Sequence, residues 1–192
     1  MGLVEPVDDL RDSNPPSNPE LWALLKREFA AGYDLRKLMR FIVTSRAYQL
    51  AADTTRANAD DRRFHSHFYA RRLPAEVLLD AVSAVAAMPS EFKGPDNKPF
   101  PKGTRALQLP DANVDSYFLR TFGRPERLIT CECERSDEPS MTQVLHLANG
   151  GTLNGKLQAA GNRIDQLLGA SAADAAIVDE LYLAGLSRMP TE

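Results

Sequence analysis

Two cysteines separated by one residue, Cys131 and Cys133, carry the most reactive side chains in this sequence. They lie in the segment 116–150, which also contains several arginines. In an extended chain alternate side chains share a face, so both thiols would point the same way. Their Cα atoms would be about 6.6 Å apart, since an extended residue spans about 3.3 Å, and that is near the long end of disulfide geometry. A disulfide between them would therefore be strained and easily reduced.

Three roles for this candidate thiol pair compete. The sequence favours a structural role, because free cysteine is among the most buried residue types. A redox role is the second, since the positive charges of Arg127 and Arg135 favour the thiolate form. Metal binding is the third, but zinc takes four ligands, so a histidine distant in the sequence would have to join the cysteines. The histidines of the chain are His65, His67 and His146.

The arginines of the same segment form a second candidate site. Guanidinium groups match the geometry of carboxylates and sulfates, so they can bind an anionic ligand. They can also form ion pairs with the acidic residues between 126 and 138, and this is the role that the sequence favours. Polar residues of the following helix lie opposite its apolar stripe and can line a cleft. The predicted ligand or partner surface consists of Arg124, Arg127, Arg135, Gln143, His146 and Asn149.

Motifs of the common enzyme classes are missing from the sequence. It lacks the Cys-x-x-Cys-His motif of haem attachment, the Walker A phosphate loop, the GxSxG nucleophile motif and the HExxH zinc motif. We therefore name no catalytic residue, and we expect no metal and no cofactor within this chain.

The composition of the chain limits the kinds of partner and the cellular location that we expect for it. The proportions of 43% hydrophobic and 26% charged residues are typical of a globular protein. The net charge of −3 gives no reason to expect a nucleic-acid partner. No run of about 18 apolar residues occurs, so we expect no membrane span. The first residues are acidic and lack an apolar core, so we expect no export signal within this chain.

Apolar residues recur at helical spacing along most of the chain, which predicts helices. The clearest stripe consists of Leu35, Leu38, Met39, Ile42 and Val43. Side chains suited to begin helices are Asn18, Asp34, Thr152 and Ser171. Only the ranges 106–109 and 127–135 alternate as short strands do.

The predicted fold is mostly α: an irregular multi-helix domain with long loops and at most one or two short β segments. We expect a single helical domain over 1–192. It consists of an extended arm (1–18), N-terminal helices (19–88), a long loop (89–113), and the cysteine and arginine segment with the C-terminal helices (114–192). The last residues resemble the start of a further helix, so we expect a C-terminal fragment of a larger protein.

Several long phrases of the sequence resemble a known family. They are GLVEPVDDLRDSNPPSNPEL, RRLPAEVLLDA, GTRALQLPD, SYFLRTFGRPER, CECERSDEPS and QVLHLANG. Together they resemble the planctomycete PSD-type domain of unknown function, over almost the whole chain. The resemblance implies the C-terminal region of a large extracytoplasmic protein, either periplasmic or secreted, from bacteria that degrade complex and often sulfated polysaccharides. It also implies haem c only in a separate upstream cytochrome-c-like module, and it transfers no catalytic residues.

Two functions follow as hypotheses. The first is a non-catalytic binding or scaffold module of a cytochrome-c-linked protein associated with polysaccharide use. Its partners would be the rest of the full-length protein, including the cytochrome-c-like module, and an anionic polysaccharide. The alternative is a redox or metal-dependent enzyme domain that uses Cys131 and Cys133.

Overall fold

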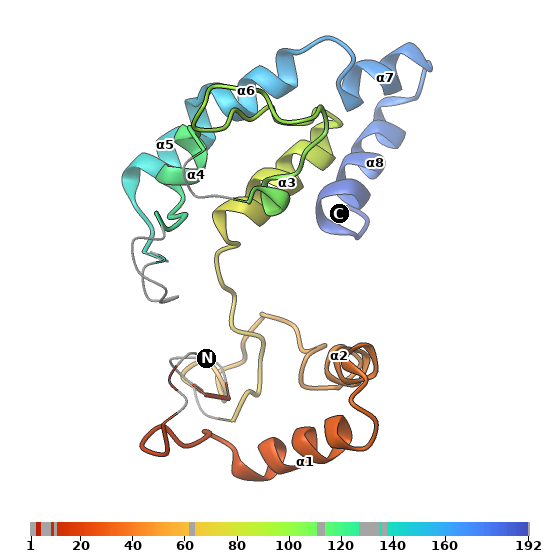
Figure 1. Cartoon of the computed structure of the whole chain (residues 1–192). Helices are drawn as coiled ribbons and strands as arrows, with labels where there is room; N and C mark the ends of the chain where they lie inside the picture. The colour runs from red at the N-terminus through yellow and green to blue at the C-terminus, as the bar shows by residue number, and fades with distance from the viewer. Residues whose placement is uncertain are drawn as a thin grey trace. The chain divides into compact units, whose positions relative to one another are not determined.

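The computed structural model describes residues 3–4, 9, 11–61, 64–110, 114–126, 135 and 138–191. These residues form α-helices and one short 3-10 helix, and they contain no sheet, which confirms the prediction of an irregular, mostly α fold (Figure 1). The elements are α1 (Pro19–Ala30), α2 (Leu35–Val43), α3 (Ala75–Ala86), η1 (Ala106–Gln108), α4 (Tyr117–Thr121), α5 (Met141–Asn149), α6 (Gly151–Gln158), α7 (Arg163–Gly169) and α8 (Asp174–Leu186).

The chain divides into two compact units, Met1–Arg71 (unit 1) and Arg72–Glu192 (unit 2). The division falls inside the range 19–88 that the sequence assigns to the N-terminal helices. Each unit is described here by itself. The single domain over 1–192 stays a prediction.

Unit 1 is built on a hairpin of α1 and α2, which pack against each other. The side chains of Asn18 and Asp34 accept hydrogen bonds from the amides of Leu21 and Lys37, both at 3.0 Å, so the two predicted N-caps are confirmed. Tyr33 has a φ of 52°, a left-handed conformation that turns the chain between the helices. Neither helix contains a fully buried residue.

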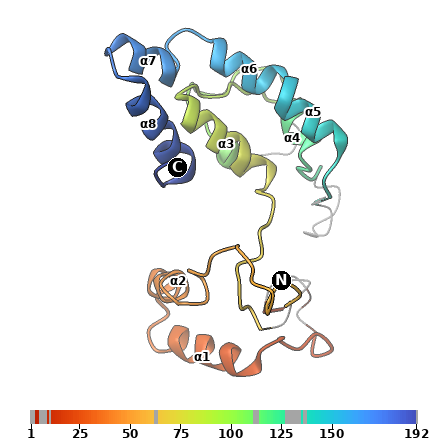
Figure 2. The ribbon, with the colours of Figure 1, turned by 180° about the vertical axis from the view of Figure 1, so that it is seen from behind.

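Unit 2 is organised around α3, which contacts η1, α4, α6, α7 and α8. Figure 2 shows α6 on one side of α3 and α8 on the other. The buried core joins the first half of α3 to α4 and to the loop between them. Its members are Ala75, Leu79, Phe92, Ala106, Val114, Phe118, Leu119 and Phe122. Since Phe92 and Ala106 belong to it, the long loop 89–113 is anchored in the core at two points.

Three local predictions are wrong, and each has a physical reason. The range 106–109, predicted as a strand, contains the 3-10 helix η1 (Ala106–Gln108), because the Asp80 carboxylate accepts hydrogen bonds from the amides of Ala106 at 2.7 Å and Leu107 at 3.2 Å. Helix α6 begins at Gly151, one residue before the expected cap Thr152. Helix α8 begins at Asp174, because Ser171 has a φ of 57° and closes α7.

Candidate functional site

Two arginines of the predicted surface converge on one buried carboxylate, that of Glu76 in the first turn of α3. Arg135 donates to it twice, from Nη1 to Oε2 at 2.9 Å and from Nη2 to Oε1 at 3.2 Å. The Nε atom of Arg124 lies 3.5 Å from Oε1. Glu76 also lies at the beginning of a helix, where the helix dipole favours a negative charge. Its carboxylate is therefore stabilised by the two arginines and by the helix.

The environment of Glu76 has opposing effects on its pKa. Burial alone would raise the pKa of this carboxyl, because it disfavours the charged form. The hydrogen bond from Arg135, the backbone hydrogen bond and the charges of Arg135 and Arg124 outweigh burial and hold the pKa below its usual range. Glu76 is therefore ionised near neutral pH.

Gln143 connects a second group of residues at the start of α5. Its Oε1 accepts from Arg72 Nη1 at 2.5 Å and from the Ser140 amide at 3.2 Å. Its Nε2 donates at 2.9 Å to the carbonyl of Thr121, the last residue of α4. Arg72 also donates to the carbonyl of Glu138 at 3.2 Å. Gln143 is buried, so these bonds satisfy a polar side chain inside unit 2 and tie α5 to α4.

His146 lies one turn further along α5, against aromatic rings of α4. Its ring centroid is 5.3 Å from that of Tyr117 and 5.5 Å from that of Phe118. Its Nε2 is hydrogen bonded to the Thr152 hydroxyl at 3.0 Å, which explains why Thr152 does not cap α6. Asn149, the last residue of the predicted surface, is exposed.

The arginines were expected to pair with acids between 126 and 138, most of which lie outside the described residues, so those pairs stay a prediction. The structure shows a partner that was not predicted, since Arg124 and Arg135 both contact Glu76. A glutamate in the first turn of a mostly apolar helix is the sequence signal that could have singled it out.

Cys131, Cys133 and Arg127 lie outside the described residues, so the roles proposed for them stay predictions. Within the described part of the chain, no three His, Cys, Asp or Glu side chains group so as to hold a metal ion.

Two cations meet the opposite end of α3, a feature that the sequence analysis missed. Lys156 is buried, and its Nζ donates to the Met88 carbonyl at 2.7 Å. Burial lowers the pKa of this ammonium group. Arg163 donates to the carbonyls of Val85 at 2.7 Å and Ala84 at 3.0 Å, and it pairs with Glu180 of α8 at 2.6 Å. These contacts satisfy carbonyls at the helix end and place positive charge where the helix dipole favours it.

Lys156 also lines a cleft of about 380 Å³, which we call the α4–α6 cleft. It lies between the end of α3, α4 and α6, the elements that Figure 1 shows close together in unit 2. Its apolar wall includes Leu79, Phe92 and Phe118. Its polar groups come from Ser90, Glu91, Ser116, Tyr117, Thr152 and Lys156. A cleft with an apolar wall and a few polar groups can bind and orient a small ligand or one unit of a polymer.

The geometry of Gly150 fixes the junction between α5 and α6 at the edge of this cleft. A Cβ atom at position 150 would lie 2.2 Å from the carbonyl oxygen of His146 and 2.7 Å from its Nδ1. Only glycine permits this close approach, which brings His146 to Thr152. The position of Thr152 in the cleft therefore depends on Gly150.

None of the helices in the described residues has the length and apolar character needed to cross a membrane. The model of a family described as "PSD1: Protein of unknown function (DUF1553)" matches residues 1–192. No curated protein and no solved structure matches the chain. The resemblance of the long sequence phrases to a PSD-type domain of unknown function is thereby confirmed.

Proposed function

From the premise that this chain belongs to the PSD1 family of unknown function, we propose that it is a non-catalytic binding module for an anionic polysaccharide. The observation that carries this proposal is the α4–α6 cleft, whose lining includes the buried Lys156. The contacts of Arg72, Glu76, Arg124, Arg135 and Gln143 tie the start of α3, the end of α4 and the start of α5 together within the same unit.

The side chains of the cleft suit an acidic sugar unit. Tyr117 is 57% exposed and offers a ring face on which a sugar can stack. The hydroxyls of Ser90, Ser116 and Thr152 can exchange hydrogen bonds with sugar hydroxyls. Lys156 can donate to a carboxylate or sulfate, because its ammonium group has three donors and one bonds Met88.

The rest of the proposal rests on the family resemblance. We propose that the chain is an extracytoplasmic part of a larger protein. The haem c of that protein lies in a separate cytochrome-c-like module, and this module is the partner of the chain. Of the predicted surface, the side chains of His146 and Asn149 are proposed to contact the module, because Asn149 is exposed and His146 is half-buried, while Arg124, Arg135 and Gln143 are held in contacts inside unit 2. Arg127→Ala tests the role predicted for Arg127, which lies outside the described residues.

Calorimetric titration with dextran sulfate, and with neutral dextran for comparison, tests the glycan proposal. We expect dextran sulfate to bind and dextran to bind much more weakly. Tyr117→Ala and Lys156→Met should each weaken binding by about tenfold, since stacking and charged hydrogen bonds are each worth about 1 kcal/mol or more. Tyr48→Ala is the matched control, because Tyr48 is 54% exposed and belongs to unit 1. Equal binding of the Tyr117→Ala, Lys156→Met and control variants would overturn the proposal.

A further inference from the structure

One helix of unit 1 carries an apolar strip that faces solvent. Leu35, Met39 and Val43 follow one another at intervals of four residues along α2, so they share a face. They are 56%, 56% and 43% exposed. Leu38 and Ile42 are half-buried and provide the side of α2 that packs in the hairpin. The exposed strip is therefore a different face of α2 from the one that packs against α1.

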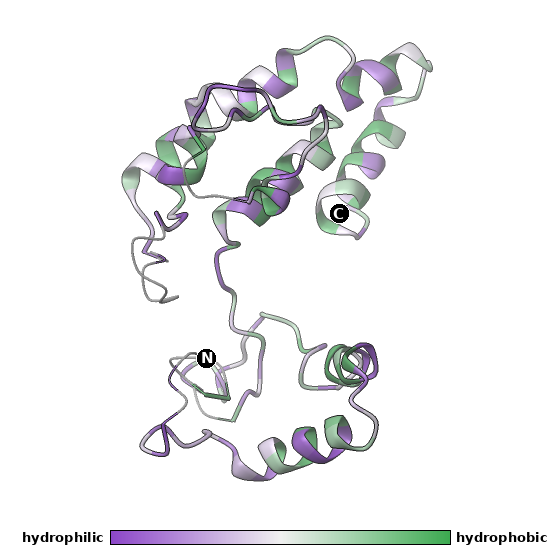
Figure 3. Ribbon diagram, in the orientation of Figure 1, coloured by the Kyte–Doolittle hydropathy of each residue, from purple (hydrophilic) through white to green (hydrophobic). Residues whose placement is uncertain are grey.

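Basic side chains border this strip. At 100° per residue, Arg36 and Arg40 follow the strip directly around the helix, and Figure 3 shows apolar and polar residues on different sides of α2. Neither arginine forms an ion pair with any residue that the structure describes, while Lys37 lies 4.0 Å from Glu28. Helix α2 contains no acidic residue.

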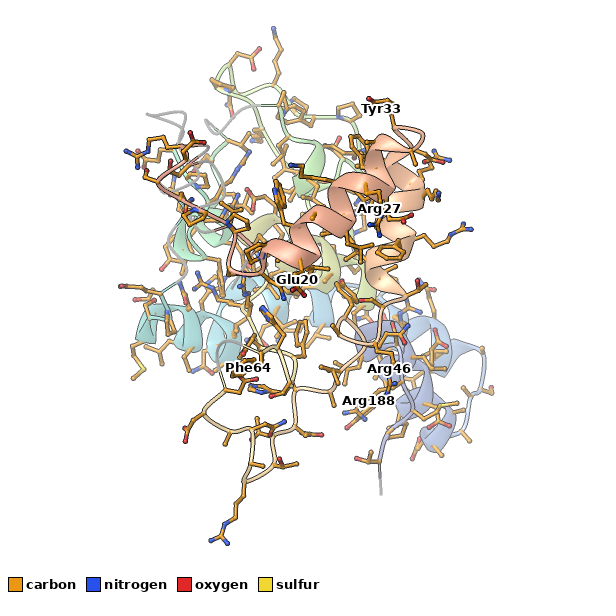
Figure 4. All side chains as sticks on the ribbon, turned by 90° about the horizontal axis from the view of Figure 1, so that it is seen from below. Glu20, Arg27, Tyr33, Arg46, Phe64 and Arg188 are labelled. Atoms are coloured by element: carbon orange, nitrogen blue, oxygen red, sulfur yellow. The ribbon has the colours of Figure 1, made fainter. Side chains whose placement is uncertain are left out.

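The charge of the whole hairpin is opposite to that of the chain. Residues 19–43 contain five Lys and Arg side chains and three Asp and Glu side chains, a net charge of +2, whereas the chain carries −3. Figure 4 shows the hairpin with its labelled side chains, Tyr33 at the turn and Arg27 on α1. Positive charge and exposed apolar surface therefore coincide on one hairpin.

We propose that this hairpin docks onto an anionic phospholipid surface, with Leu35, Met39 and Val43 inserted at the level of the headgroups. A short helix with an apolar strip and a basic polar face lies in the plane of a membrane interface, where burial of the strip and attraction to anionic lipids both favour binding. Such an arrangement needs no helix that spans the bilayer. The surface belongs to unit 1 and is independent of the glycan cleft of unit 2.

The charge beside the strip favours a lipid surface over a second copy of the chain as its binding partner. Two copies that met through this strip would bring Arg36 and Arg40 of both chains together, and like charges at an interface weaken association. Anionic headgroups neutralise the same arginines, and each basic residue near such a surface contributes about 1 kcal/mol.

Vesicle binding by the full chain tests the proposal. Trp22 is the only tryptophan of the sequence, belongs to α1 and is 41% exposed, so its emission reports on the hairpin. Vesicles of phosphatidylcholine with one quarter phosphatidylglycerol should shift this emission to the blue, and phosphatidylcholine vesicles alone should not. The double variant Arg36→Glu/Arg40→Glu should bind the anionic vesicles at least about tenfold more weakly.

Apolar variants and matched controls complete the experiment. Leu35→Ser and Met39→Ser should each weaken vesicle binding by about tenfold, because they remove buried apolar area at the interface. The controls are Leu107→Ser, at a 55% exposed position of unit 2, and Lys98→Glu/Lys102→Glu on its exposed loop. Three results would overturn the proposal: equal binding to neutral vesicles, α2 variants that bind as the controls do, or self-association that Met39→Ser abolishes without any vesicle binding.

Discussion

The carboxylate of Glu76 is the point at which two arginines of unit 2 meet. Arg124, Arg135 and Glu76 are all largely removed from solvent. If one of these charges is lost, water therefore cannot solvate the remaining charges unless the structure rearranges. Removing one partner of a buried ion pair leaves the other charge uncompensated, which costs more than the pair itself contributes. Glu76 therefore matters more to stability than the surface ion pairs of the chain.

Glu76→Gln tests this conclusion. The neutral side chain keeps the shape of glutamate but removes the buried negative charge that both arginines contact, so the free energy of unfolding should fall by about 3 kcal/mol. Urea denaturation measures the loss. Asp115→Asn is the matched control, because its pair with Arg120 is exposed and should change stability by about 0.5 kcal/mol or less. Equal losses in the two variants would contradict a structural role for the Glu76 cluster.

The same carboxylate predicts a dependence of stability on pH. Its pKa in the folded chain lies below the usual value of 4.5, so the unfolded chain takes up a proton at a higher pH than the folded chain does. The stabilisation is complete above the unfolded pKa and is lost as the pH falls through the folded pKa. The difference in unfolding free energy between wild type and Glu76→Gln should therefore shrink below about pH 4.5. A difference that stays constant from pH 7 to pH 3 would refute the linkage.

At the scale of the elements, the junction of α5 and α6 depends on one glycine. Gly150→Ala places a methyl group against the His146 carbonyl, so we expect a loss of about 2 kcal/mol or more in unfolding free energy. The neighbouring Gly151→Ala is the control: nothing lies within 4 Å of its Cβ position, and alanine favours a helix over glycine by up to about 1 kcal/mol. Thermal denaturation of both variants separates the clash from the general effect of losing a glycine. A stable Gly150→Ala protein would show that the junction can rearrange.

Features encoded in neighbouring residues could be predicted from the sequence, and features encoded by distant residues could not. Asn18 and Asp34 cap their helices through bonds to amides three residues away, so local spacing reveals them. The strand predicted at 106–109 fails because Asp80, 26 residues earlier, binds the amides of that segment. The Glu76 and Arg135 contact spans 59 residues, and Lys156 reaches Met88 across 68. No periodicity in the chain could indicate such pairs.

At the scale of the whole molecule, burial is unequal between the two units. The fully buried hydrophobic residues of the described chain all lie in unit 2, while the hairpin of unit 1 leaves Trp22, Leu35 and Met39 exposed. Burial of apolar surface is the main favourable contribution to folding, and regions with few buried contacts open at lower free energy. Unit 1 is therefore expected to be the less stable unit.

Unfolding followed by two probes tests this difference in stability. The emission of Trp22 reports on unit 1, and helical circular dichroism reports mainly on unit 2, which holds six of the described α-helices. In urea the Trp22 transition should come at a lower concentration than the loss of helical signal. Phe118→Leu in the core of unit 2 should lower the second midpoint and leave the first unchanged, because Phe118 packs within unit 2. Coincident transitions that move together in this variant would instead mean that residues 1–192 unfold as one domain.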